Sequence, residues 1–170
     1  RKRTTKRAIR SVKDELRHLL AHDEDLIFSA LLTLIKCTLR TNYYRTDRIF
    51  YYLSFKFNST KIPTIGVNGP KYEIYVHHRE IEGVHLRFGS VARGGIRWSN
   101  RDDFRTEVLG LATTQQVKNA IIVPTGAKGG FYLKNASRDS GKRRAEADYH
   151  YQTFIRGLLD LTDNSVEGKL

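Results

Sequence analysis

Two glycine pairs, each beside a cationic side chain, constrain this chain more than any other feature of its sequence. The first lies in the run Arg-Gly-Gly-Ile-Arg-Trp-Ser at 93–99, and the second in Pro-Thr-Gly-Ala-Lys-Gly-Gly-Phe at 124–131. Glycine carries no Cβ, so the backbone at such a pair can approach another group closely. A lysine or arginine fixed beside that backbone suits a small anion. The two runs therefore predict a pocket for a small carboxylate or phosphate.

A helical pattern lies between the two runs. Ser99 or Asn100 can cap its start, and acidic residues follow in its first turn. Gln115 and Lys118 are three residues apart near its C-terminal end, so their side chains share one face. That pair offers a neutral amide and a second cation. The apolar face of the helix is expected to consist of Phe104, Val108, Leu111 and Ala112.

The second glycine run follows a short apolar stretch at 120–123, which is expected to form a buried strand that Pro124 ends. Residues 126–130 are then predicted to turn the chain. The polar stretch 135–144 is expected to be a mobile loop. A last helix is predicted over 144–161, and its expected buried residues are Tyr149, Ile155, Leu158 and Leu159.

The N-terminal part of the chain predicts two helices. Residues 1–10 are basic and expected to be frayed, and 11–22 have an amphipathic pattern. A second helix is predicted from residue 23 to about residue 42, followed by Tyr43 and Tyr44 as packing aromatics. One face of that helix would consist of Ile27, Ala30, Leu31, Leu34, Ile35 and Thr38.

Three segments, at 51–57, 72–77 and 83–88, alternate apolar with polar residues and are predicted as strands. Adjacent histidines on a strand point to opposite faces, and no carboxylate motif accompanies them. We therefore expect core or surface histidines rather than metal ligands at His77, His78 and His85. Helices and strands in mixed order predict an α/β domain.

The net charge of +12 would suit nucleic acid or an acidic membrane face. The excess lies mainly at the N-terminus and around residues 142–144, and neither cluster interleaves aromatic residues as stacking platforms do. The expected explanation is therefore a solvated face, or a surface met by acidic parts of the rest of the protein. No membrane partner is expected, and a nucleic-acid partner is not favoured.

Cys37 is the only cysteine, which allows no internal disulfide and no cysteine metal cluster, so a small core residue is expected there. The longest apolar run, at 26–35, is too short to span a bilayer. No signal-peptide pattern is present, and a cytoplasmic protein is expected. The chain contains no methionine and begins at Arg1, so it is interpreted as an internal piece of a longer protein.

The ordered motifs resemble those of the glutamate dehydrogenases, most closely their large, NAD-specific bacterial class. In the common amino-acid dehydrogenases, a Lys-Gly-Gly-aliphatic-Arg segment precedes a helix with Gln-x-x-Lys, and Gly-Ala-Lys-Gly-Gly follows. The matching segments here are 93–97, 115–118 and 126–130. The amino-acid sequences of residues 102–110 and 154–160 resemble those of the large class most closely.

The resemblance implies NAD-dependent, reversible oxidative deamination of L-glutamate to 2-oxoglutarate and ammonia. It implies that Lys128 is the catalytic lysine. The residues implied to hold the substrate's two carboxylates are Arg93, Gly94, Gly95, Gln115 and Lys118. This chain has arginine at 93 where the family has lysine, and a single glycine precedes Ala127.

The resemblance also implies a substrate-side and subunit-contact domain with a sheet of mixed direction, flanked by helices, in a homo-oligomer. Residues 1–22 would be a basic N-terminal segment and helix, and 23–170 a portion of that domain. No dinucleotide fingerprint is present, so NAD is expected to bind mainly to a downstream domain, leaving this chain inactive alone. Two alternatives stay open: an anion- or nucleic-acid-binding module, and a non-catalytic oligomerisation domain.

Overall fold

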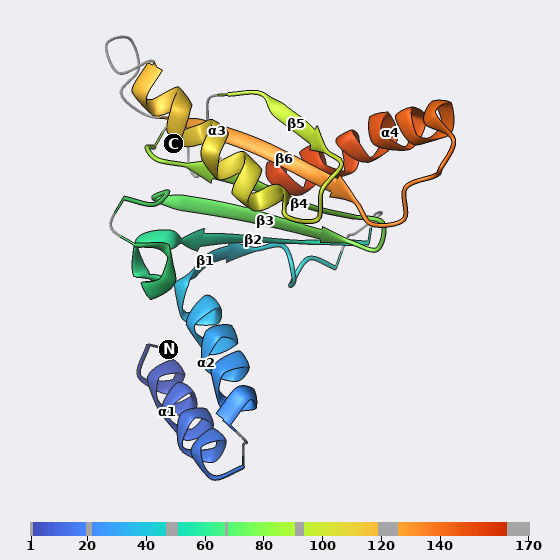
Figure 1. Cartoon of the computed structure of the whole chain (residues 1–170). Coiled ribbons are helices and arrows are strands. Elements are labelled where there is room, and N and C mark those ends of the chain that lie inside the picture. Colours follow the sequence, from blue (N-terminus) through green and yellow to red (C-terminus); the bar gives the residue numbers. More distant parts are fainter. Residues whose placement is uncertain are drawn as a thin grey trace. The chain divides into compact units, whose positions relative to one another are not determined.

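The computed structural model describes residues 2–19, 22–46, 51–66, 68–90, 94–118 and 126–162 (Figure 1). The chain divides into two compact units, 1–37 and 38–170. The first holds a pair of helices, and the second holds a sheet with its own helices. The division predicted after residue 22 was drawn from composition and resemblance, and it stays a prediction.

The first unit consists of α1 (Lys2–Leu19) and α2 (His22–Cys37). The expectation that residues 1–10 are frayed is wrong, because α1 already begins at Lys2. The long basic side chains there are good helix formers, and the segment contains neither glycine nor proline. Cys37 is buried, with 4% of its surface exposed, as predicted for a small core residue.

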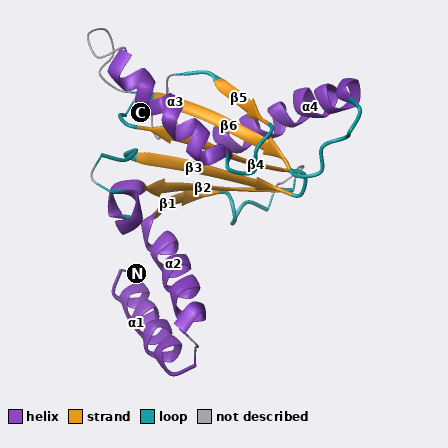
Figure 2. Cartoon of the chain, viewed as in Figure 1, coloured by secondary structure: helices purple, strands orange, loops and turns teal. Residues whose placement is uncertain are grey.

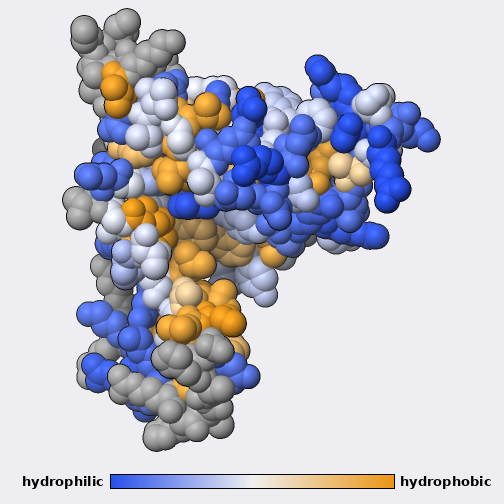
Figure 3. Space-filling view, in the orientation of Figure 1, coloured by the Kyte–Doolittle hydropathy of each residue, from blue (hydrophilic) through white to orange (hydrophobic). Residues whose placement is uncertain are grey.

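One face of α2 is apolar and exposed, as the space-filling view shows (Figure 3). Its side chains are between 43% and 66% exposed and belong to Leu26, Ile27, Phe28, Leu31 and Ile35. The prediction of this face agrees only in part. Ile27, Leu31 and Ile35 belong to it, whereas the predicted Thr38 begins the strand Thr38–Thr41. Leu32, which was not predicted, is the buried leucine of this helix. Two helices present only one contact face to each other, so the remaining apolar stripe of α2 stays at the surface.

The second unit is built on a six-stranded sheet in the order β1-β2-β3-β4-β6-β5. All neighbouring strands are antiparallel except β5 and β6, which are parallel. The sheet is therefore mixed, as expected for this α/β fold. Its strands are β1 (Thr38–Thr41), β2 (Tyr52–Asn58), β3 (Tyr72–His78), β4 (Ile81–Arg87), β5 (Ile96–Ser99) and β6 (Ala127–Leu133).

Helices cover both faces of this sheet (Figure 2). On one face, α3 (Phe104–Lys118) buries Phe104 and Val108 against Val84 and Leu86. On the other, α4 (Ser140–Leu159) buries Phe154 in a larger core. That core also contains Tyr52, Ile74, Val76, Ile81, Phe131, Leu133, Ala147, Leu158 and Leu161. Two short 3₁₀ helices, Ser59–Lys61 and Pro63–Ile65, lie between β2 and β3.

The segment β5–α3–β6 is a parallel strand–helix–strand unit. Parallel strands start at the same edge of a sheet, and the helix between them runs back toward that edge. The start of β5, the end of α3 and the start of β6 therefore meet at one edge. This topology joins the two glycine runs and the Gln-x-x-Lys segment.

The prediction that residues 126–130 turn the chain is wrong, because Ala127–Leu133 forms strand β6. Its glycines have a packing role instead. A Cβ at Gly129 would overlap Ile96, and one at Gly130 would overlap Val108. Glycine within a strand commonly marks such close approach, and it removes the alternation by which a strand is recognised. The strand predicted at 120–123 lies outside the described residues.

Other boundaries also differ from the predictions. The second helix ends at Cys37, because the threonine-flanked stretch Thr38–Thr41 pairs with β2 as strand β1. The last helix starts at Ser140, where the Asp139 side chain accepts a hydrogen bond from the Lys142 amide at 2.8 Å. The loop before it is therefore shorter than expected. Five side chains predicted to be buried or packed are exposed: Tyr43, Tyr44, Leu111, Tyr149 and Leu159.

Candidate functional site

Four of the predicted site residues meet at the edge where β5 and β6 begin. A Cβ at Gly95 would lie 3.4 Å from the Lys128 Nζ atom. A Cβ at Gly94 would lie 3.2 Å from the Gln115 Oε1 atom. The first glycine pair thus lies against the Lys128 amine of β6 and the Gln115 amide of α3. Three separate segments of the chain therefore contribute to this site.

Gly94 is needed for its backbone conformation and for space. Its φ is +122°, a backbone conformation that residues other than glycine rarely adopt. A Cβ at this position would also overlap the carbonyl oxygen of Ala127. At Gly95, in contrast, the Lys128 amine is the nearest group within 4 Å. Of these two positions, Gly95 leaves more room for a ligand beside the lysine.

Gln115 presents a buried acceptor that no described group satisfies. Its Oε1 atom is inaccessible to solvent and has no hydrogen-bond partner among the described residues. Buried polar atoms are almost always paired in native proteins, so an unpaired one indicates a missing donor. The position of this atom beside Gly94 directs it toward the glycine pair.

Lys128 is half-buried at the start of β6. Side chains alternate along a strand, so Lys128 lies on the same face as Gly130, which packs against Val108 of α3. The C-terminal end of α3 carries a partial negative charge from its unpaired carbonyl groups. A cation is therefore favoured here, whereas an anionic ligand would need several cations to hold it.

Arg93 and Lys118 are the remaining predicted site residues. Arg93 lies outside the described residues, and so does the side chain of Lys118, whose backbone ends α3. Helical spacing puts Lys118 on the same side of α3 as Gln115.

A polar network that sequence reasoning missed ties β5 to α3. The Glu107 carboxylate accepts a hydrogen bond from the Ser99 hydroxyl at 2.7 Å and forms an ion pair with the Arg97 guanidinium. These contacts, chiefly the Ser99 hydrogen bond, lower the pKa of Glu107. Arg97 therefore belongs to the scaffold that holds the Gly94–Gly95 backbone. The network was missed because the short strand β5 was not predicted.

His85 lies on the opposite face of the sheet, beside Gly129. Burial, and then the neighbouring Arg87, lower the pKa of His85 to about 4, so it is neutral at pH 7. Its Nδ1 atom accepts a hydrogen bond from the Arg87 Nε at 3.3 Å. His85 is therefore a core histidine, which is one of the two possibilities that the sequence left open. Within the described part of the chain, no three histidine, cysteine or acidic side chains are placed to hold a metal ion.

None of the helices in the described ranges is both long and apolar enough to cross a membrane.

Comparison with known proteins places the chain in a family. Residues 11–170 match the model described as bacterial NAD-glutamate dehydrogenase, catalytic domain. The chain is 53% identical over 171 residues to the NAD-specific glutamate dehydrogenase of Pseudomonas aeruginosa, covering 96% of the chain and 10% of that relative. The enzyme of the same name from Mycobacterium tuberculosis is 47% identical over 174 residues, covering 95% of the chain and 11% of the relative.

A third relative, the NAD-specific glutamate dehydrogenase of Halomonas elongata, is 52% identical over 156 residues, which cover 87% of the chain and 10% of that protein. The chain thus spans about a tenth of the length of the curated relatives it matches. These matches support neither a nucleic-acid-binding module nor a non-catalytic oligomerisation domain. The chain belongs to the family of bacterial NAD-glutamate dehydrogenase catalytic domains.

Proposed function

We propose that the protein containing this chain catalyses NAD-dependent, reversible oxidative deamination of L-glutamate to 2-oxoglutarate and ammonia. One observation carries the proposal: the Lys128 amine and the unsatisfied Gln115 acceptor lie against the same glycine pair. The relatives named above, which are called NAD-specific glutamate dehydrogenases, support the choice of reaction and substrate.

The substrate would be held by cations and an amide around this edge of the sheet. Glutamate carries two carboxylates, and the negative end of the α3 dipole disfavours an uncompensated anion. Arg93 and Lys118 are proposed to supply the compensating charges, with the backbone of Gly94 and Gly95 beside them. The Gln115 amide lies beside Gly94 and adds a neutral hydrogen-bonding group at this edge.

Lys128 is the proposed catalytic residue. In oxidative deamination a hydride leaves the α-carbon for NAD, and water then hydrolyses the imine of the substrate. An amine at the position of Lys128 can accept a proton from that water and then, as an ammonium, stabilise the developing negative charge on oxygen. Lys128 is half-buried, so its amine is held beside Gly95 and is still accessible to a ligand there.

The residues of this chain do not fit a dinucleotide site. The sequence contains no Gly-x-Gly-x-x-Gly run, so we assign none of its residues to NAD. NAD is proposed to bind mainly to another part of the protein. We also propose that the protein is a homo-oligomer in the cytoplasm and that it has no nucleic-acid or membrane partners.

The test replaces Lys128 in the full-length enzyme. Lys128→Ala and Lys128→Arg should each reduce kcat by at least ~100-fold, because neither side chain can exchange a proton at neutral pH. NAD affinity and folding should be retained. Lys142→Ala removes an exposed lysine from α4 and is the matched control, with kcat expected to be unchanged.

Near-normal kcat in Lys128→Arg would show that the residue supplies only charge, and the proposed role would be lost. A panel of amino acids assayed with NAD and with NADP tests the substrate and cofactor separately. Turnover of another amino acid in preference to glutamate would overturn the substrate assignment while leaving the role of Lys128 intact.

A further inference from the structure

A cavity with a basic lining lies over strands β1 to β4. It has a volume of about 440 Å³, which is within the range of small-molecule sites. Three of the described residues that line it carry a positive charge and none is acidic, so the charge of this lining is of one sign. These residues are Leu39, Arg40, Lys56, Tyr72, Arg87 and Ser90.

Strand pairing places the three cations on one face of the sheet. Arg40 of β1 is paired with Lys56 of β2. Tyr72 of β3 is paired with Arg87 of β4, and the Lys56 Nζ atom lies 5.3 Å from the centre of the Tyr72 ring. Arg87 and His85 are on the same side of β4, and the Arg87 Nε atom donates to His85 Nδ1 at 3.3 Å. Four strands therefore contribute to this cavity.

The helix α4 packs on the neighbouring part of the same face. A Cβ at Gly157 of α4 would overlap Val76 of β3 and would lie 2.9 Å from the Ser54 Oγ atom of β2. Side chains alternate along a strand, so Lys56 lies on the same face as Ser54, and Tyr72 on the same face as Val76. The apolar core beneath α4 thus ends where the basic cavity begins.

Two of the three cations are more than nine-tenths buried. Lys56 is 7% exposed and Arg87 is 8% exposed. Removing positive charges from water costs free energy, and like charges around one cavity repel each other. The charge of Arg87 also contributes, after burial, to the low pKa of His85, which is about 4. An anion in the cavity would offset this repulsion.

We propose that this cavity binds a phosphate group through Arg40, Lys56 and Arg87. A guanidinium presents its N–H donors in a planar fork that matches two phosphate oxygens, and a lysine adds a compact positive charge. A guanidinium has five donors, so Arg40 can bind an anion while its Nη1 atom donates to the Thr162 carbonyl oxygen at 2.9 Å. Sites of this volume hold whole small molecules, so a phosphomonoester fits the cavity as well as free phosphate.

The phosphate site is separate from the proposed glutamate site. Lys128 is paired with Leu86, whose side chain packs with Val108 of α3. Arg87, the next residue of β4, points to the opposite face of the sheet. The inference therefore does not depend on the proposed dehydrogenase reaction. Phosphate binding and loss of activity at Lys128 can be measured independently.

The experiment is calorimetric titration of the full-length protein with inorganic phosphate, at constant ionic strength and with NAD at saturation so that the phosphate sites of the cofactor are occupied. Saturable binding is expected. Phenyl phosphate distinguishes the two sources of the group, because tighter binding of this ester than of inorganic phosphate would identify a phosphomonoester as the ligand, and the reverse order would identify the free anion. Succinate divides the same charge between two separate carboxylates and should bind more weakly. Succinate binding as tight as that of phosphate would overturn the assignment.

Lys56→Gln removes a buried charge from the cavity and should weaken phosphate binding by at least ~10-fold. Lys71→Gln is the matched control. The Lys71 Nζ atom lies 5.4 Å from the centre of the same Tyr72 ring, but Lys71 is exposed and does not line the cavity. Its effect should stay within about twofold, as for an exposed charge. Equal losses in the two variants would indicate general attraction of anions to a basic surface and would overturn the proposal.

Arg40→Gln decides the question if Lys56→Gln does not fold, because Arg40 is exposed. A ligand that binds the folded state raises its Tm, so phosphate should raise the Tm of the unmodified protein more than that of Arg40→Gln. Wild-type affinity in Arg40→Gln, or no saturable binding of either phosphate compound to the unmodified protein, would refute the site. Lys128→Ala should bind phosphate normally, and loss of binding in that variant would assign the anion to the glutamate site instead.

Discussion

At Gly94 the backbone has a φ of +122° and lies directly against the carbonyl group of Ala127. Gly94→Ala would place a methyl group where that carbonyl oxygen lies, in a conformation that alanine rarely adopts. The strain alone should cost roughly 1–3 kcal/mol, and relief of the overlap would shift Gly94 away from Gln115. We therefore expect a lower Tm together with a raised glutamate KM.

Gly110 offers the comparison for that substitution. It lies in the middle of α3, and a Cβ there would meet no atom within 4 Å. Gly110→Ala should stabilise the helix by about 0.5–1 kcal/mol and leave KM unchanged. Both variants can be compared by thermal unfolding and steady-state kinetics. A Gly94→Ala enzyme with wild-type Tm and KM would mean that β5 can move freely at its start.

At the scale of elements, the Ser99–Glu107–Arg97 network connects β5 with α3 and so positions the first glycine pair. The folded-state pKa of Glu107 is lowered below its ordinary value of 4.5, chiefly by the Ser99 hydrogen bond. A group with a lowered folded pKa stabilises the fold above its unfolded pKa, and this contribution is lost as pH falls through the folded pKa. The network should therefore stabilise the protein at neutral pH and weaken in acid below pH 4.5.

Glu107→Gln tests this pH dependence. Its Tm should be below that of the unmodified protein near neutral pH, and the difference should shrink as the pH is lowered below 4.5, the ordinary pKa of a glutamate. Glu15→Gln changes an exposed glutamate of α1 and should show no such trend. A Tm difference that is the same at all pH values would assign the effect to packing rather than to the charge of Glu107.

At the scale of the whole molecule, we expect NAD binding to depend on residues outside this chain. The 170 residues contain no dinucleotide fingerprint, so the chain by itself should show neither NAD binding nor activity. Calorimetric titration of the 170-residue chain with NAD should give only heats of dilution, whereas the full-length enzyme should give a saturable signal. Saturable binding to the chain alone would place cofactor contacts within these residues.

The amino-acid sequence determined the α/β class, the long helices and the strands β2, β3 and β4. In those elements the spacing of apolar residues matches the period of a helix or a strand, because one side of each element faces a core. The ordered motifs also identified Gly94, Gly95, Gln115 and Lys128 as candidates before their positions were known. Their spacing in the sequence did not show that they meet.

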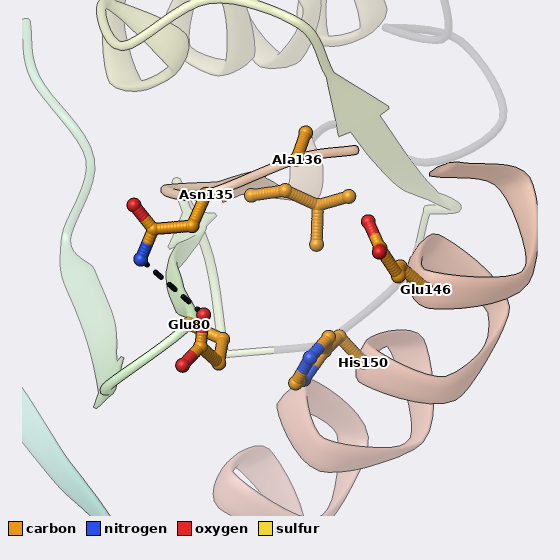
Figure 4. Close-up of a pocket in the computed structure, with 6 residues that line it drawn as sticks. Glu80, Asn135, Ala136, Glu146 and His150 are labelled. Carbon is orange, nitrogen blue, oxygen red and sulfur yellow. Dashed lines mark hydrogen bonds between the residues drawn. The ribbon is translucent and has the colours of Figure 1, made fainter. Parts of the chain in front are cut away.

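Tertiary structure alone decided the rest. Strand β6 contains glycines because Ile96 and Val108 fill the space where side chains would stand, and those partners come from β5 and α3. No local pattern could indicate this, so the segment was predicted as a turn. The cavity between Glu80, Leu133 and His150 likewise depends on the turn before β4, the end of β6 and one face of α4 meeting in space (Figure 4). Contacts between residues distant in the chain are set by how the sheet and helices pack, and the order of residues within one segment does not encode them.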